Sequence, residues 1–312
     1  MNPEVLIMLI GSLALHAAKQ TPMSGLNGLP VAKYVAVTND APTKRNQATL
    51  GIDVDARAAV VMDVASGQTL YEKDSHVAYP IASLSKIITA MVFLDGNPNL
   101  DDEITFLAED HGSAGKTVIQ TGERFKKREV LQALLIGSVN EAANALARTS
   151  GGREAFVAAM NRKARAVGME HAVFFDPSGL DARNKASARD IALALRAALS
   201  YPDLRKTTEQ PNVNLIGRAT NKKYSIKTTN LLLSSDLNRQ PYHIVAAKTG
   251  TLPEAGYCMA QATSDASGHE IIAVVLGGGT HYTRFQDVKA LTYWSFQNFV
   301  WSGKQARLIR ED

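Results

Sequence analysis

Two residues at the start of a predicted helix have the types and the spacing needed for nucleophilic catalysis. Ser83 and Lys86 lie three positions apart, which is nearly one helical turn, so the hydroxyl and the amine share a face. A serine is a weak nucleophile until a neighbouring base takes its proton. A buried lysine near other cations can have a pKa low enough for that task. The start of a helix also offers backbone N–H groups to a developing oxyanion.

The same spacing occurs a second time, so the pair is not specific by itself. Ser113 and Lys116 are also three residues apart, but Gly115 lies between them and no amphipathic helix begins there. Their side chains need not face each other. We therefore expect the chemistry at Ser83.

A second polar group lies where a helical pattern breaks. Ser138 and Asn140 separate the apolar helical positions of residues 130–135 from those of residues 142–147. Ser138 could relay a proton between Lys86 and a leaving group, and Asn140 could donate to an amide carbonyl of the substrate. Taken alone, the two residues fit equally well as groups that cap and restart helices.

A third group follows an apolar run at residues 244–247 that predicts a strand. Lys248 and Thr249 could bind a carboxylate, and Gly250 would let the backbone approach a substrate closely. In chain order, Ser-x-x-Lys, Ser-x-Asn and Lys-Thr-Gly are far more specific together than any one of them. The three groups are expected on different elements, at a helix start, at a helix break and on a strand.

Composition and charge limit the other classes of function. The chain has 312 residues, of which 45% are hydrophobic and 21% charged, as in a globular protein. The net charge of +4 is spread without a Lys/Arg-rich run, so we expect no nucleic-acid partner. The single cysteine, Cys258, lies in an apolar run typical of a packed strand. No HExxH motif occurs, and we expect neither a metal nor a cofactor.

The chain divides into four predicted parts. Residues 1–18 contain an apolar stretch that is too short to span a bilayer but has the length of a signal-peptide core. Residues 19–56 predict a linker or extended arm, residues 57–302 the catalytic domain and residues 303–312 a tail. We expect an exported protein of the periplasm or cell envelope, with no stable membrane anchor.

The element pattern predicts an α/β (α+β) fold. Strands are expected at residues 58–63, 69–71, 244–247, 256–262 and 271–276, and the main helices between them, followed by a final helix at residues 284–301. Ser187 and Asp190 have the form of a capping box for one of these helices. Distant strands would then pair in one antiparallel sheet flanked by helices, with the helical block as an inserted lobe.

The segments around the motifs resemble the low-molecular-mass penicillin-binding proteins, the D-alanyl-D-alanine carboxypeptidase and endopeptidase family. The similar segments are Pro80–Ala90, Gly137–Ala147, Asp176–Leu180, Lys248–Gly250 and Ala255–Cys258. The resemblance covers residues 57 to 300 and implies a penicillin-binding transpeptidase-like (β-lactamase-like) fold.

The resemblance also implies an activity. Ser83 would be acylated at a D-Ala bond of peptidoglycan stem peptides, with Lys86 as general base, and water would release the acyl group. The oxyanion hole would be the backbone N–H groups of Ser83 and Thr251. β-Lactam antibiotics would be covalent inhibitors. Many carboxypeptidases of the family carry a further C-terminal domain and a membrane-binding helix, and the shorter form seen here resembles the endopeptidase branch.

Two other functions share part of this pattern. A β-lactamase needs a carboxylate to activate the deacylating water, and the expected Glu-x-x-Leu-Asn pattern is missing between the second and third motifs. A non-catalytic module that binds the wall or senses β-lactams would not need intact chemistry at Ser83, Lys86, Ser138, Asn140 and Lys248. The sequence does not separate carboxypeptidase from endopeptidase activity.

Overall fold

The computed structural model describes residues 41–112 and 117–302. The predicted signal peptide at residues 1–18, the first part of the predicted arm, the second Ser-x-x-Lys copy at residues 113–116 and the tail at residues 303–312 lie outside the described residues. In the described ranges no helix combines the length and the apolar character that crossing a membrane requires.

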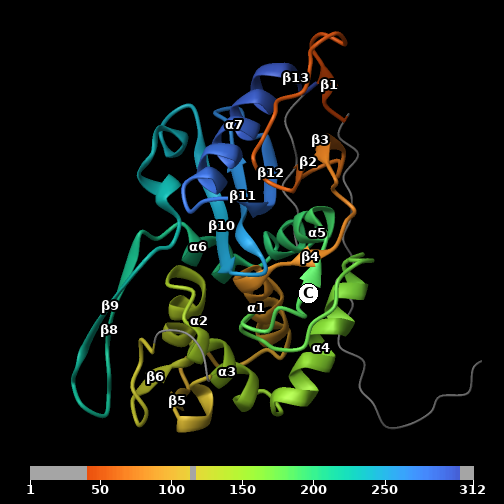
Figure 1. Cartoon of the computed structure of the whole chain (residues 1–312). Coiled ribbons are helices and arrows are strands. Elements are labelled where there is room, and N and C mark those ends of the chain that lie inside the picture. The colour runs from red at the N-terminus through yellow and green to blue at the C-terminus, as the bar shows by residue number, and fades with distance from the viewer. Residues whose placement is uncertain (1–40, 113–116, 303–312) are drawn as a thin grey trace, which may run out of the picture. The chain divides into compact units, whose positions relative to one another are not determined.

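One antiparallel sheet of five strands forms the centre of the fold (Figure 1). Its order is β10 (His243–Leu252), β11 (Gly256–Ser264), β12 (Glu270–Gly278), β2 (Ala58–Asp63) and β3 (Thr69–Lys73). β2 pairs with β12 from Ala58 opposite Leu276 to Asp63 opposite Ile271, so strands from the two ends of the chain lie side by side. The predicted pairing of sequence-distant strands in one antiparallel sheet is confirmed.

Both faces of the sheet are buried, because its central strands are apolar at nearly every position. On β2, Ala58, Val60 and Met62 face one hydrophobic cluster, and Ala59 and Val61 face the other. The first cluster packs against α1 (Ser85–Asp95) and α5 (Ala188–Ala198). The second packs against α7 (Thr283–Asn298). The sheet is therefore the middle layer of three.

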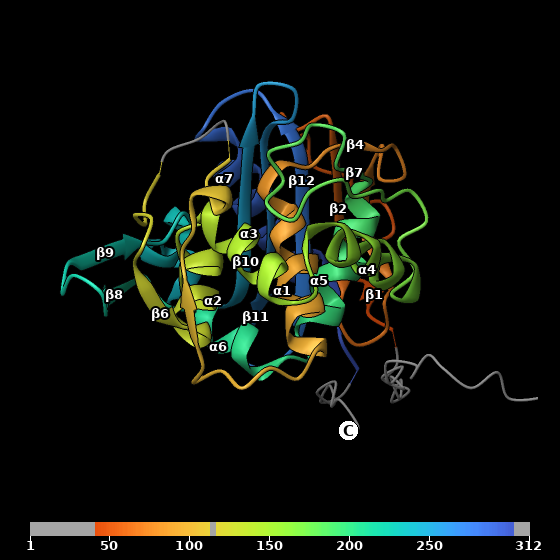
Figure 2. The ribbon, with the colours of Figure 1, turned by 90° about the horizontal axis from the view of Figure 1, so that it is seen from below.

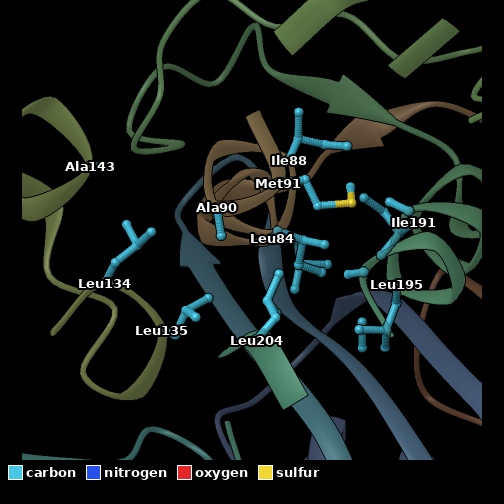
Figure 3. Packing of buried hydrophobic residues seen from close by; sticks show 14 of the residues in the cluster. Leu84, Ile88, Ala90, Met91, Leu134, Leu135, Ala143, Ile191, Leu195 and Leu204 are labelled. Carbon is cyan, nitrogen blue, oxygen red and sulfur yellow. The ribbon is translucent and has the colours of Figure 1, made fainter. Parts of the chain in front are cut away.

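The helix that carries the predicted nucleophile is held in the first of these clusters. Figure 3 shows Leu84 and Met91 beside Ile191 and Leu195 of α5, with Leu204 close by. All five side chains are almost completely buried. The packing fixes the position of α1, and therefore of the residues at its start, relative to the sheet.

The remaining helices of the block form a lobe below the sheet in the view of Figure 1. Figure 2 shows α1 in the middle of this lobe. Its neighbours are α2 (Lys127–Ile136), α3 (Asn140–Thr149) and α4 (Arg153–Ala166). The predicted capping box is present, since the Ser187 hydroxyl accepts the backbone N–H of Asp190 at 3.0 Å. The predicted helical lobe is confirmed.

Several short elements were not predicted from the sequence. They are α6 (Pro202–Thr208), the hairpin β8 (Asn212–Ile216) with β9 (Lys223–Lys227), the pairs β5 (Glu103–Thr105) with β6 (Arg124–Lys126) and β4 (Tyr79–Pro80) with β7 (Lys185–Ala186), and the 3₁₀ turns η1 (Ala82–Leu84), η2 (Ala108–Asp110), η3 (Leu231–Ser234) and η4 (Asp236–Asn238). The hairpin extends away from the lobe in Figure 1. Only one of its faces is apolar, with Leu215, Tyr224 and Ile226 buried.

The described end of the predicted arm lies against the domain. β1 (Thr43–Lys44) pairs with β13 (Phe299–Val300), and Val54 and Ala56 are buried. The Asp287 carboxylate on α7 accepts the backbone N–H of Ala56 at 2.9 Å. Packing therefore begins before residue 57. The last helix ends at Asn298, and not at residue 301 as predicted, because residues 299–300 pair with β1.

Candidate active site

Ser83 lies in the tight turn that leads into α1, and Lys86 lies in the first turn of that helix. The Lys86 ammonium donates to the Ser83 hydroxyl, with 2.8 Å between Nζ and Oγ. Ser83 is half-buried, whereas Lys86 is completely buried. The preceding residue, Ala82, has a φ of 47°, a conformation that costs an L-residue free energy and is common where a functional side chain must be aimed. The predicted face-to-face arrangement of hydroxyl and amine is present.

Three groups surround the Lys86 amine. Besides Ser83, it donates to the Asn140 amide oxygen at 2.8 Å and to the backbone carbonyl of Ser178 at 2.5 Å. Burial lowers the pKa of Lys86 to about 7, and the charges of Asp176 and Glu141 oppose this shift. Near neutral pH a substantial share of the amines is therefore unprotonated. An unprotonated amine at this distance can accept the hydroxyl proton of Ser83.

A buried loop holds the Ser178 carbonyl against Lys86. The Asp176 carboxylate accepts the backbone N–H groups of Ser178 and Gly179 at 3.0 and 3.1 Å, and it also accepts the Ser178 hydroxyl. Asn184 ties this loop to the nucleophile segment, because it donates to the Ser85 hydroxyl at 3.0 Å and to the Asp176 carbonyl at 2.9 Å. The loop therefore fixes one wall of the Lys86 site.

We expect the substitution Asp176→Asn to loosen this wall. The amide has one acceptor oxygen where the carboxylate has two, so buried N–H groups of the loop lose a partner. The free energy of unfolding should fall by about 2 kcal/mol, as measured by urea denaturation. The control Asp236→Asn removes a carboxylate that is exposed and pairs with the exposed Arg239, and it should change stability little. Equal stability of the two variants would show that the Asp176 hydrogen bonds do not hold the loop.

Ser138 and Asn140 lie in the predicted break between α2 and α3. Ser138 has a φ of 58°, which turns the chain sharply between the two helices. Its hydroxyl accepts from the Lys248 ammonium at 2.7 Å. Asn140 is the first residue of α3, and its oxygen is occupied by Lys86, so its NH₂ group remains to donate. The two residues thus contact the two buried lysines.

The third motif lies on β10, the edge strand next to the nucleophile segment. Lys248 is buried and donates to the Thr249 carbonyl at 2.8 Å as well as to Ser138. Burial lowers the pKa of Lys248 well below its usual value, and the neighbouring charges of Lys86 and Arg284 lower it further. The site therefore favours an anion close to Lys248. The Thr249 hydroxyl donates to the Thr229 hydroxyl at 2.7 Å.

Gly250 lies on β10 close against the nucleophile segment. A Cβ atom at this position would lie 2.8 Å from the Ile81 carbonyl oxygen and 3.2 Å from the Ser83 nitrogen. A side chain would push the strand and the nucleophile segment apart. The absence of a side chain at Gly250 thus lets Thr251, the next residue of the strand, follow directly beside the Ser83 segment.

Arg284 is a site residue that was not predicted from the sequence. It extends from α7, is 3% exposed, and donates to the Gly250 carbonyl at 3.1 Å and to the Thr251 hydroxyl at 2.9 Å. Burial lowers the pKa of Arg284 from its usual value. It therefore fixes the end of β10 and adds a positive charge to the site. An arginine within a helical pattern looks like a solvent-exposed residue, so the sequence carries no signal for this role.

Comparison with known proteins places this fold and site. A family profile described as D-alanyl-D-alanine carboxypeptidase matches residues 42–280. The D-alanyl-D-alanine endopeptidase of Pseudomonas aeruginosa is 33% identical, over 85% of this chain and 85% of that protein. The D-alanyl-D-alanine endopeptidase of Escherichia coli is 29% identical, over 85% of this chain and 84% of that protein.

Solved structures agree. A Streptomyces DD-transpeptidase has a TM-score of 0.73 at 26% identity, covering 80% of this chain and 100% of that chain. A Listeria monocytogenes penicillin-binding protein in its cefotaxime-bound form has a TM-score of 0.69 at 30% identity, covering 80% and 100%. The fold is that of the penicillin-binding D,D-peptidases. The chain belongs to the D-alanyl-D-alanine carboxypeptidase family, and it is a peptidase. The family resemblance expected from the three motifs is confirmed, and the alternatives of a β-lactamase and of a binding module are not favoured.

Proposed function

We propose that this peptidase cleaves D-Ala bonds in the cross-links of peptidoglycan stem peptides, as a D,D-endopeptidase that forms an acyl-enzyme on Ser83. The observation that carries the proposal is the 2.8 Å contact between the Ser83 hydroxyl and a completely buried Lys86 amine. The endopeptidase assignment is supported by two relatives with that name, which match this chain over most of both lengths.

Acylation would begin with proton transfer from Ser83 to neutral Lys86. The Ser83 oxygen then attacks the scissile carbonyl, and the oxyanion lies against the backbone N–H groups of Ser83 and Thr251. Lys248 and Thr249 bind a carboxylate on the leaving side, which restores the charge of Lys248. When the C–N bond breaks, the amine leaves with a proton that reaches it through Ser138.

Deacylation would use the same groups in reverse. A water molecule gives its proton to Lys86, attacks the ester carbonyl and releases Ser83 with the carboxylic acid product. Asn140 keeps its NH₂ group for an amide carbonyl of the acyl chain, because its oxygen is held by Lys86. No group beyond these side chains and backbone atoms is needed for either half of the reaction. β-Lactams would acylate Ser83 by the same route and remain bound as covalent inhibitors.

The proposed substrate implies a location. Cross-linked stem peptides occur in the cell wall, so we infer that the protein works in the cell envelope after export. The predicted signal peptide supports this inference. The relatives that match the chain over most of its length carry the names of enzymes that act on D-alanyl-D-alanine bonds.

Digestion of purified muropeptides tests the proposed activity. Cross-linked dimers and uncross-linked pentapeptide monomers are incubated separately with the enzyme, with the Ser83→Ala variant and with penicillin-treated enzyme, and the products are followed by mass spectrometry. We expect dimers to be converted to monomers by the untreated enzyme only. Loss of one terminal D-Ala from pentapeptides without dimer cleavage would instead assign the chain as a carboxypeptidase.

A further inference from the structure

A cavity adjoins the predicted active site at the end of the sheet. It has a volume of about 590 Å³ and is lined by the turn between β10 and β11, by the end of β12 and by Asp55 and Arg57. Thr251 lines it, and Thr251 is also the site residue bound by Arg284. Tyr257 lines it as well, directly opposite Thr251 in the sheet. A cavity of this size accommodates a peptide fragment of a few residues.

Arg57 gives this cavity a free cationic group. Its aliphatic stem lies flat on Gly277, where a Cβ atom would be 2.8 Å from Cδ and 3.0 Å from Cβ of Arg57. The side chain is exposed, and within residues 41–112 and 117–302 it has no ion-pair partner. The packing of the stem positions the guanidinium, which has no carboxylate partner in these residues. It is therefore suited to bind a carboxylate of a ligand, because its N–H donors can form two parallel hydrogen bonds with the two carboxylate oxygens.

The cavity also carries a negative group beside a floor of glycines. The Asp55 carboxylate accepts the backbone N–H of Gly279 at 2.6 Å. This hydrogen bond lowers the pKa of Asp55, so the group is ionised at neutral pH. Gly256, Gly278 and Gly279 also line the cavity, so no side chains cover its backbone at these positions. The cavity therefore offers one cation, one anion and backbone polar groups, which is the complement of a peptide with a free carboxylate and N–H groups.

We propose that this cavity is the subsite for the stem peptide on the leaving side of a cross-linked substrate, and that Arg57 binds a carboxylate of that peptide. The inference rests on the proposed endopeptidase function. Thr251 links the two regions, because it lies at the proposed oxyanion position and also lines the cavity. A pentapeptide monomer loses only a single D-Ala, which has no second stem to place there. Arg57 thus discriminates cross-linked from uncross-linked substrates.

The test compares dimers and monomers as substrates of Arg57→Gln, Arg57→Lys and the unaltered enzyme. The kcat/KM for dimer cleavage is divided by the kcat/KM for release of D-Ala from pentapeptide. We expect the ratio to fall about tenfold in Arg57→Gln, mainly through the KM for dimers, because a charge-assisted contact to the carboxylate is lost. Arg57→Lys keeps the positive charge, so it should retain part of the preference for dimers. The matched control Arg239→Gln removes an exposed arginine that follows η4, before β10 begins, and should leave the ratio unchanged.

The ratio and the cleavage of dimers together decide whether Arg57 forms a subsite. An unchanged ratio in Arg57→Gln, with dimers still cleaved, would overturn the subsite and leave the proposed endopeptidase function intact. Failure of the unaltered enzyme to cleave any dimer, with pentapeptides still hydrolysed, would overturn both. An equal fall in Arg239→Gln would show a general effect of charge and would also overturn the role of Arg57. Thermal denaturation of every variant shows that the fold is retained.

Discussion

The substitution Lys86→Arg is expected to reduce the rate of acylation by about a thousandfold or more, because general-base catalysis contributes roughly 10² to 10⁴-fold. Arginine keeps the positive charge and the hydrogen-bond donors, but it does not lose its proton at any pH at which the protein is folded. It therefore cannot take the proton of Ser83, which lies 2.8 Å from the Lys86 amine. The rate is measured by stopped-flow mixing with a chromogenic β-lactam, and by hydrolysis of a D-alanyl-D-alanine peptide.

Lys223→Arg is the matched control for this variant. Lys223 lies on the outward face of the β8–β9 hairpin and is exposed, so the same change there should leave acylation unaltered. Circular dichroism shows whether the larger side chain at position 86 is accommodated. A folded Lys86→Arg enzyme that retains a tenth or more of the acylation rate would contradict the role of Lys86 as base.

The second large effect is a dependence of acylation on pH. The active form of Lys86 is the neutral amine, and burial places its pKa at about 7. The value of kcat/KM should therefore fall about tenfold for each pH unit below 7 and level off above it, since kcat/KM reports the ionisation of the free enzyme. A midpoint near 10, the usual range of an exposed lysine, would show that Lys86 is not desolvated in the working enzyme.

The same pKa shift makes a prediction for stability. The pKa of Lys86 is lower in the folded state, so between about pH 7 and its usual value the unfolded chain binds more protons than the folded one. The contribution of Lys86 to the free energy of unfolding should therefore rise with pH across that window. Below pH 7 the folded protein keeps a buried charge, and this contribution is at its minimum. Urea denaturation at several pH values, compared with Lys86→Met, isolates this contribution.

The sequence predicted those parts of the site that depend on local patterns. Ser83 and Lys86 face each other because three residues on a helix make nearly a turn, and the helix was visible from its apolar spacing. Lys248 lies on a strand because the preceding residues form an apolar run. Ser138 and Asn140 lie in a helix break that the same periodicity showed. Their positions relative to one another came from the family resemblance and not from these patterns.

Other parts of the site have no local pattern. The contact from Lys86 to the Ser178 carbonyl involves a backbone group, which has no residue signature, although residues 176–180 were already part of the resemblance. Arg284 reaches β10 from a helix on the other face of the sheet, and only the three-layer packing brings it there. The hairpin at residues 212–227 was not predicted, although lysine, asparagine and serine alternate with apolar residues in its strands, which is the pattern of strands packed on one face.

The central claim is that Ser83 forms the acyl-enzyme, and mass spectrometry of penicillin-treated protein tests it most directly. We expect the intact mass to rise by that of one penicillin molecule, and peptide mapping to place the added mass on Ser83. The Ser83→Ala variant should show no added mass. An adduct on Ser113, which shares the spacing to a lysine, or an equal adduct in Ser83→Ala, would contradict the claim.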